Sequence, residues 1–245
     1  MNEYERIGDG YAGRRRADPR LARTIADALE GASSVVNVGA GTGSYEPARP
    51  GTVAVEPAVA MIAQRAVASA PCVRAYAEAL PFGDGAFDAG LAVLTMHHWT
   101  DWRAGLRELA RVARSRVVLF TWDPECEGFW LSRDYLPDML AADRRRFPPM
   151  GALREALGNA RVQRVPIPHD CTDGFLGAYW RRPAAYLDPS IRESMSSFRR
   201  EGFADGLARL AADLESGVWM RRYGQLLQQP ALDTGMCLVV ADVRR

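Results

Sequence analysis

The stretch Val35-Val36-Asn37-Val38-Gly39-Ala40-Gly41-Thr42-Gly43 decides the fold of this chain. Its apolar half predicts a short strand that is buried on both faces. Three glycines at alternate positions cannot continue a strand or a helix cheaply, so the chain has to turn tightly after Val38. Because glycine lacks a Cβ atom, this turn lets a ligand lie directly against the backbone.

The residues after the turn exclude the usual dinucleotide fingerprint. That fingerprint requires Gly or Ala at position 44 and a long helix after it, whereas this chain has Ser44 followed by Pro47 and Pro50. A second apolar strand, residues 52–55, begins at once and ends at Glu56. An acidic residue at the end of the second strand can accept both hydroxyls of a ribose, which indicates a nucleoside site.

Composition narrows the function further. The chain has 245 residues, of which 48% are hydrophobic, and this suits one domain with an added small cap. The formal net charge is +1, so no bulk field favours nucleic acid. No apolar run reaches membrane-spanning length and the polar start of the chain does not resemble a signal peptide, so we expect a cytoplasmic protein without a membrane partner.

The residue types present also exclude several kinds of chemistry. The sequence contains no lysine, which excludes a P-loop, a Schiff base and a lysine general base. The cysteines are scattered and form no C-x-x-C pair, and the three histidines do not form a ligand pattern, so we expect no metal site.

The two strands and their turn carry a family resemblance. VVNVGAGTGSYEP followed by VAVEPAVAMI resembles the first two motifs of the class I S-adenosylmethionine-dependent methyltransferases. Residues 76–88, YAEALPFGDGAFD, resemble the third motif. One position departs from the pattern, because members of the family often have an acidic residue where this chain has Asn37.

The resemblance implies S-adenosyl-L-methionine as the methyl donor and S-adenosyl-L-homocysteine as the product. It also implies a set of cofactor-binding residues: Asn37, Gly39, Ala40, Gly41, Gly43, Glu56, Pro57, Met61, Ala77, Glu78, Ala79, Leu94 and Thr95. The segment with Tyr11, Arg15 and residues 18–20 resembles the start of the menaquinone-biosynthesis, or methyltransferase-11, subgroup. There it folds over the donor, so Tyr11 and Arg15 are expected to reach the methionine carboxylate. The alternative for this arginine-rich segment is a solvated face.

The acceptor site is expected where strands one and four end, because ligands of open parallel sheets lie beyond the carboxyl ends of the strands. His97 and His98 follow strand four and are the catalytic candidates, since the ordinary pKa of histidine suits a general base. Other candidate bases are His169, Asp123 and Asp173. The candidate acceptor-binding residues are His98, Trp122, His169, Tyr179 and Trp180. Each of them could instead be a core or capping residue.

The order of elements predicts an α/β fold. We expect a Rossmann-like, seven-stranded, mostly parallel sheet with an antiparallel last strand, helices on both faces, and a helical cap inserted between strands six and seven. The expected divisions are a lid segment and first helix (1–30), a donor-binding core (31–167) with a covering helix near 125–150, the cap (168–230) and the last strand (231–245). Within the cap, helices are expected near 190–200 and 204–216.

These observations predict an enzyme that methylates a small molecule, with specialised metabolism as one setting. The acceptor, the atom that is methylated and the oligomeric state stay open. A non-catalytic donor-binding regulator or subunit with the same fold is the alternative. A nicotinamide-dependent oxidoreductase is disfavoured by Ser44, and a nucleic-acid methyltransferase by the absence of an Asn/Asp-Pro-Pro-aromatic motif after strand four.

Calorimetry tests the cofactor prediction. The glycine turn and Glu56 are expected to bind S-adenosylmethionine and S-adenosylhomocysteine, and not NAD. Binding of NAD at micromolar concentration without any binding of S-adenosylmethionine would contradict the whole interpretation.

Overall fold

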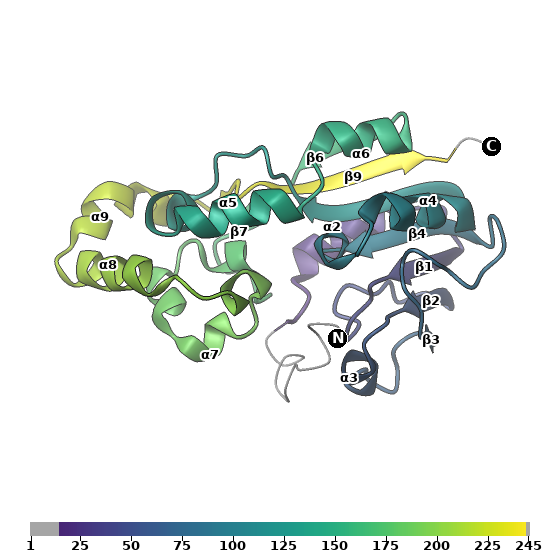
Figure 1. Cartoon of the computed structure of the whole chain (residues 1–245), viewed down its shortest axis with the longest axis horizontal. Helices are drawn as coiled ribbons and strands as arrows, with labels where there is room; N and C mark the ends of the chain where they lie inside the picture. The colour runs from purple at the N-terminus through teal and green to yellow at the C-terminus, as the bar shows by residue number, and fades with distance from the viewer. Residues whose placement is uncertain (1–14, 244–245) are drawn as a thin grey trace.

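A seven-stranded sheet forms the centre of the computed structural model, which describes residues 15–243 (Figure 1). Its order is β3-β2-β1-β4-β5-β9-β6. The strands are β1 (Ser34–Val38), β2 (Gly51–Val55), β3 (Cys72–Val73), β4 (Phe87–Val93), β5 (Ala113–Trp122), β6 (Arg161–Arg164) and β9 (Met236–Asp242). The pairs among β1 to β5 are parallel, and β9 runs antiparallel to both β5 and β6. The predicted sheet with an antiparallel last strand is confirmed.

Helices cover both faces of this sheet, and others lie beyond the carboxyl ends of its parallel strands. They are α2 (Pro19–Ala28), α3 (Val59–Ala63), α4 (Trp102–Val112), α5 (Pro137–Arg146), α6 (Met150–Leu157), α7 (Pro189–Arg192), α8 (Ala204–Glu215) and α9 (Val218–Tyr223). Local sequence explains where two of these helices begin. In α2, the carboxylate of Asp18 accepts a hydrogen bond from the backbone N–H of Arg20, and Pro19 is the first helical residue. In α4, the carboxylate of Asp101 accepts from the backbone N–H groups of Arg103 and Ala104. Within the described residues, no helix is long and apolar enough to cross a membrane.

Adjacent strand residues pack on opposite faces. Val35 and Val118 join the cluster that includes Ile25 of α2, whereas Val36 joins the cluster that includes Leu109 of α4. Each central strand is therefore buried on both sides, as its unbroken apolar sequence predicts.

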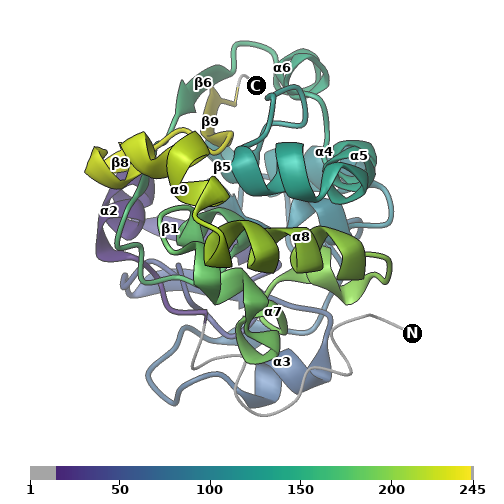
Figure 2. The same ribbon diagram turned by 90° about the vertical axis from the view of Figure 1, so that its left-hand side faces the viewer.

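A helical insertion, residues 169–230, lies beyond the carboxyl ends of the parallel strands (Figures 1 and 2). It begins after β7 (Ile167–Pro168) and ends before β8 (Ala231–Leu232), and these two short strands pair antiparallel in a small sheet of their own. Besides α7 to α9 it holds the short helical turns η4 (Leu176–Tyr179), η5 (Pro183–Leu187), η6 (Ser196–Arg199) and η7 (Gly224–Gln228). The strand pair holds both ends of the insertion at one point of the fold.

Aromatic rings join the insertion to the segment that follows β5. Trp130 packs edge-on against Tyr186 and Trp219, with ring centroids 5.7 Å and 5.3 Å away. All three belong to the cluster that also contains Val35 and Val118 of the sheet. The insertion thus shares the core of the sheet, and this shared core fixes its position over the strand ends.

Two predicted helices are shorter than expected. The covering helix is divided into a π-helical turn, η3 (Leu131–Tyr135), and α5, because Pro137 starts a new helix and disfavours helical backbone at Leu136. The helix expected near 190–200 ends at Arg192, since the hydroxyl of Ser194 donates to backbone carbonyls.

Trp180 requires a correction. It was predicted to contact the acceptor, but it has 0% exposed surface and its Nε1 donates to the carbonyl of Ile167 at 2.8 Å. Its own carbonyl accepts a hydrogen bond from Trp130 Nε1. The structure therefore places Trp180 in the core that joins the insertion to the sheet.

Trp180→Ala tests this placement. Removing a fully buried tryptophan is expected to lower the free energy of unfolding by about 3–5 kcal/mol, as measured by urea denaturation. Met220→Ala, at a position that is 55% exposed, is the control and should change it by less than about 0.5 kcal/mol. If the unfolding free energy did not change and the affinity for the acceptor fell, Trp180 would instead be an acceptor-binding residue, as the sequence predicted.

Candidate active site

The glycine turn after β1 is shaped by a close contact with the end of β4. Gly39 has a φ of +71°, and a Cβ atom placed on it would lie 2.0 Å from Thr95 Oγ1. Its backbone N–H and that of Ala40 both donate to the carbonyl of Val55, at 2.8 and 3.0 Å. Only glycine fits here, and the turn is held against the end of β2.

Glu56 closes this turn from the end of β2. Its Oε2 accepts from the backbone N–H of Gly41 at 2.9 Å, and its Oε1 accepts from the N–H of Ala58 at 2.9 Å. Burial raises the pKa of the Glu56 carboxyl, while these two N–H groups and Arg65 oppose that shift. A carboxylate offers about four lone-pair positions, so two remain for further donors.

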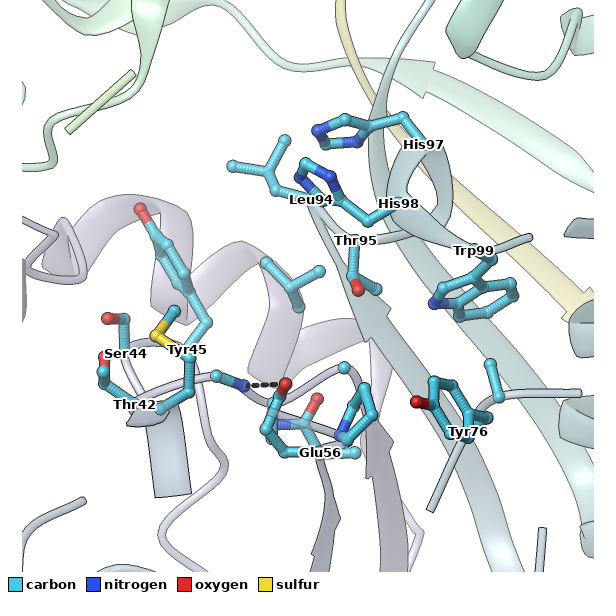
Figure 3. Close-up of a pocket in the computed structure, with 18 of the residues that line it drawn as sticks. Thr42, Ser44, Tyr45, Glu56, Tyr76, Leu94, Thr95, His97, His98 and Trp99 are labelled. Atoms are coloured by element: carbon cyan, nitrogen blue, oxygen red, sulfur yellow. Dashed lines mark hydrogen bonds between the residues drawn. The ribbon is translucent and has the colours of Figure 1, made fainter. Parts of the chain in front are cut away.

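A cavity of about 470 Å³ lies at the carboxyl edge of the sheet (Figure 3). Most of the residues predicted to bind the donor lie on its wall: Arg15, Asn37, Gly39, Ala40, Gly41, Glu56, Pro57, Met61, Ala77, Glu78, Leu94 and Thr95. The volume falls in the range of about 300–1,000 Å³ that is typical of small-molecule sites. Residues far apart in the chain therefore meet in one site of suitable size.

Three predicted donor-binding residues are not placed on this wall. Gly43 has Arg65 and Ser69 as its nearest neighbours, and Ala79 is exposed. Tyr11 lies outside the described residues. Glu78 lines the cavity and also accepts from the backbone N–H groups of Thr100 and Asp101, so it has a structural contact as well.

Several residues of the wall were not predicted from the sequence. Tyr76 and Trp99 lie on the same side of the cavity in Figure 3, and Arg146 reaches it from the end of α5. Trp99 fits because residue 105 is glycine: a Cβ there would lie 2.5 Å from the indole ring. Arg146 belongs to an arginine run that predicts a solvated helix end, so no sequence signal marked it.

Arg15 is held beside the cavity by a buried carboxylate. Its Nε donates to Asp173 Oδ1 at 2.8 Å, and the side chain of Asp173 is fully buried. Tyr45 Oη donates to Oδ2 of the same carboxylate at 3.0 Å, and Ser44 Oγ donates to the Arg15 carbonyl at 2.5 Å. This network joins the start of the described chain, the glycine turn and the insertion.

His97 and His98 stand on the 3-10 turn η2 (Met96–His98), directly after β4. Their ring centroids are 3.8 Å apart, and His97 stacks on Phe147 at 4.2 Å. Burial lowers the pKa of His98 to about 3, helped by nearby guanidinium groups, among which that of Arg146 has the largest effect. Burial also lowers the pKa of His97, reinforced by His98 and Arg146. Both rings are neutral at physiological pH and are weaker bases than an ordinary histidine.

A second, smaller cavity of about 90 Å³ adjoins the first. Arg15, Leu94, His97 and His98 line both, so these residues stand at the boundary. Leu94 has a φ of +50°, and it is the one residue other than glycine with a positive φ in the described chain. Such strain costs of order 1–3 kcal/mol and tends to occur at functional sites.

The remaining candidates divide between the small cavity and other places. Trp122 lines the small cavity, whereas His169 lies outside both cavities, is half-buried, and has its Nδ1 3.2 Å from the carbonyl of Pro230. Tyr179 packs against Tyr186 and under the guanidinium of Arg182 instead of lining either cavity.

Two candidate bases are occupied in ion pairs. Asp123 accepts from Arg164 at 2.6 Å, and Asp173 is bonded to Arg15 as described above. Neither lines the larger or the smaller cavity described above. Within residues 15–243, no group of three or more His, Cys, Asp or Glu residues could hold a metal ion.

The chain is similar to known methyltransferases. A family model described as a methyltransferase domain matches residues 36–121. Demethylmenaquinone methyltransferase of Mycolicibacterium gilvum is 35% identical over 131 residues, which cover 50% of this chain and 58% of the relative. The matched segment thus spans less than two thirds of that curated relative.

Solved structures are also similar. A putative methyltransferase from an antibiotic biosynthesis pathway of Anabaena variabilis is 32% identical, with a TM-score of 0.84, and the match covers 93% of this chain and 98% of that one. The fold is shared as well by geranyl diphosphate C-methyltransferase of Streptomyces coelicolor, solved with S-adenosyl-L-homocysteine, at 14% identity and a TM-score of 0.52 over 92% of this chain and 76% of that one.

The lowered pKa of His98 predicts a dependence of stability on pH. Below its ordinary pKa of 6.5, the unfolded chain binds a proton at His98 that the folded chain does not bind until about pH 3. Stability is therefore lost as the pH falls from 6.5 towards 3. Between pH 7 and pH 5, urea unfolding of the parent should lose about 1–2 kcal/mol that His98→Gln does not lose. Equal losses in the two proteins would contradict the neutral, buried imidazole.

Proposed function

Because this chain belongs to the class I S-adenosylmethionine-dependent methyltransferases, we propose that it transfers a methyl group to a small-molecule acceptor. The methyl donor is S-adenosyl-L-methionine, which carries a methyl group on a sulfonium that a nucleophile displaces. The observation that carries the proposal is the pair of adjoining cavities at the carboxyl edge of the sheet. One has the size and polar groups for the donor, and the other adjoins it through the histidine pair.

The larger cavity fits the donor by its chemistry. The two lone-pair positions left on Glu56 would accept the ribose hydroxyls, and the backbone of Gly39 and Gly41 lines the same cavity. Tyr76 and Trp99 would form the adenine side of the site, together with the predicted contacts at Ala77 and Glu78. Arg15 and Arg146 would supply positive charge to the methionine carboxylate.

The smaller cavity is proposed to hold the acceptor. It is bounded by residues of the insertion, among them Phe175 and Met195, and by His97 and His98. We assign residues 168–230 the role of a cap that excludes water from the transferred methyl group. The neutral imidazoles would position the acceptor and receive a proton only when the acceptor becomes strongly acidic during the transfer.

The setting in specialised metabolism is part of the same proposal. It is supported by the similarity to a putative methyltransferase of an antibiotic biosynthesis pathway, over nearly the whole length of both chains. We do not infer the acceptor of this chain from that relative.

A labelling experiment tests the function. The purified chain is incubated with S-adenosylmethionine carrying a ¹³C methyl group and with a metabolite extract of the host, and products are followed by mass spectrometry. Gain of one labelled methyl on a single metabolite is expected. Binding of the donor without any labelled product would favour the non-catalytic regulator, and the absence of donor binding would contradict the family assignment of the site.

Glu56→Ala tests the donor site. Loss of a charge-assisted hydrogen bond costs about 1.5–3 kcal/mol, so the Kd for S-adenosylhomocysteine should rise by at least about tenfold in calorimetry. Glu108→Ala removes a carboxylate that bonds Arg111 away from the cavity and is the matched control. A collapse of the melting temperature of the unliganded Glu56 variant, with no change in Kd, would make Glu56 a purely structural residue.

A further inference from the structure

The smaller cavity carries two buried polar atoms that have no hydrogen-bond partner among the described residues. They are His97 Nδ1 and Thr234 Oγ1, which belong to residues 137 positions apart in the sequence. Thr234 is 3% exposed, and both residues line the cavity. Buried polar groups are normally paired, so two unpaired atoms on one cavity wall indicate a missing ligand group.

Aromatic contacts connect the two atoms along this wall. His97 stacks on Phe147 at 4.2 Å, and Phe147 meets Trp122 edge-on at 5.3 Å. Trp122 Nε1 in turn donates to the carbonyl of Thr234 at 3.0 Å. The two polar atoms thus belong to one continuous, largely aromatic surface.

Gly177 packs closely against the threonine hydroxyl. A Cβ atom on Gly177, which also lines the cavity, would lie 2.8 Å from Thr234 Oγ1. Any other residue at position 177 would clash with Thr234 unless one of them moved, so this part of the wall requires glycine.

The charges around the cavity select the chemistry of the missing group. Several arginines lie near the histidine pair, with Arg146 only 3.4 Å from His98 Nδ1, and their positive charge disfavours a cationic amine. Two of them are already paired, Arg15 with Asp173 and Arg200 with Asp143. Asp143 also lines the cavity, so an anionic ligand would face a carboxylate. An uncharged group that both donates and accepts complements a neutral imidazole and a threonine hydroxyl best.

We propose that this cavity binds an uncharged hydroxyl of the acceptor, phenolic or enolic, between His97 Nδ1 and Thr234 Oγ1. The inference rests on the proposed function and names its acceptor class. The hydroxyl donates to Nδ1 and accepts from Oγ1. Its oxygen forms the new bond to the methyl carbon, the carbon–sulfur bond breaks with its electron pair left on sulfur, and the hydroxyl proton passes to His97 Nδ1 and then to water.

The size of the cavity limits the acceptor. Its volume of about 90 Å³ is smaller than the ~150 Å³ of an apolar cavity that binds benzene. A ring therefore enters only if side chains of the wall move. Met195 and Met236 line the cavity and are unbranched, so they are the side chains best able to do this.

Three probes of similar size test the hydroxyl site. Phenol, aniline and benzoate are each titrated by NMR into the full chain, which has first been saturated with S-adenosylhomocysteine. Phenol is expected to bind at least about tenfold more tightly than the other two, since a site that bonds a hydroxyl rejects groups that leave its polar atoms unpaired. Phenol binding no more tightly than aniline or benzoate would overturn the inference.

Variants of Thr234 separate the hydroxyl contact from packing. Thr234→Val keeps the shape and should weaken phenol binding about threefold to tenfold, whereas Thr234→Ser should restore it. Trp219→Phe is the matched control, because Trp219 Nε1 is also buried without a partner among the described residues but does not line the cavity. It should leave the Kd for phenol within about twofold. Equal phenol affinity of the parent and Thr234→Val would overturn the assignment of Oγ1.

The outcome for the donor distinguishes the two proposals. If S-adenosylhomocysteine does not bind in calorimetry, the proposed function fails before the hydroxyl site is reached. If it binds and the labelled metabolite carries its new methyl on nitrogen, carbon or a carboxylate, the proposed function stands and the hydroxyl inference falls. A new methyl on a phenolic or enolic oxygen supports both.

Discussion

Gly39 and Thr95 stand so close together that no side chain fits between the carboxyl ends of β1 and β4. A Cβ on Gly39 would lie 2.0 Å from Thr95 Oγ1, and the Gly39 backbone also bonds the end of β2. This contact brings three strand ends to one place. Glu56 at the end of β2 and the histidine pair after β4 thereby line one cavity. The chemistry of the site depends on this convergence, because its residues come from separate parts of the chain.

The insertion completes the site through a shared core and a buried charge. Trp130, Tyr186 and Trp219 join it to the cluster that holds the central strands, so it packs as part of the sheet's own core. Asp173, at the start of the insertion, accepts from Arg15 and Tyr45 beside the cavity. A buried carboxylate with three donors, counting the backbone of Gly174, fixes relative position well, since loss of a partner would leave an unpaired charge.

The sheet could be predicted, and so could the meeting of most candidate donor-binding residues on one cavity wall, because local sequence determines both. An apolar run, a glycine turn and an acidic residue at a strand end, here Glu56, each favour one local structure whatever the rest of the chain does. Arg146 and Trp99 could not be predicted, because their place on the wall depends on how distant elements pack. Trp180 was placed wrongly for a related reason: an aromatic residue in an insertion can line a cavity or fill a core, and its sequence pattern is the same in both cases. The low pKa of His98 likewise arises from burial and from arginines of other elements.

We expect the donor and the acceptor to meet at the boundary formed by Leu94, His97 and His98, which line both cavities. A crystal structure of the chain with S-adenosylhomocysteine tests it most directly. The ribose hydroxyls are expected to bond to Glu56, and the sulfur atom is expected at that boundary, facing the smaller cavity. A ligand whose ribose lies away from Glu56, or whose sulfur faces away from the histidine pair, would contradict it.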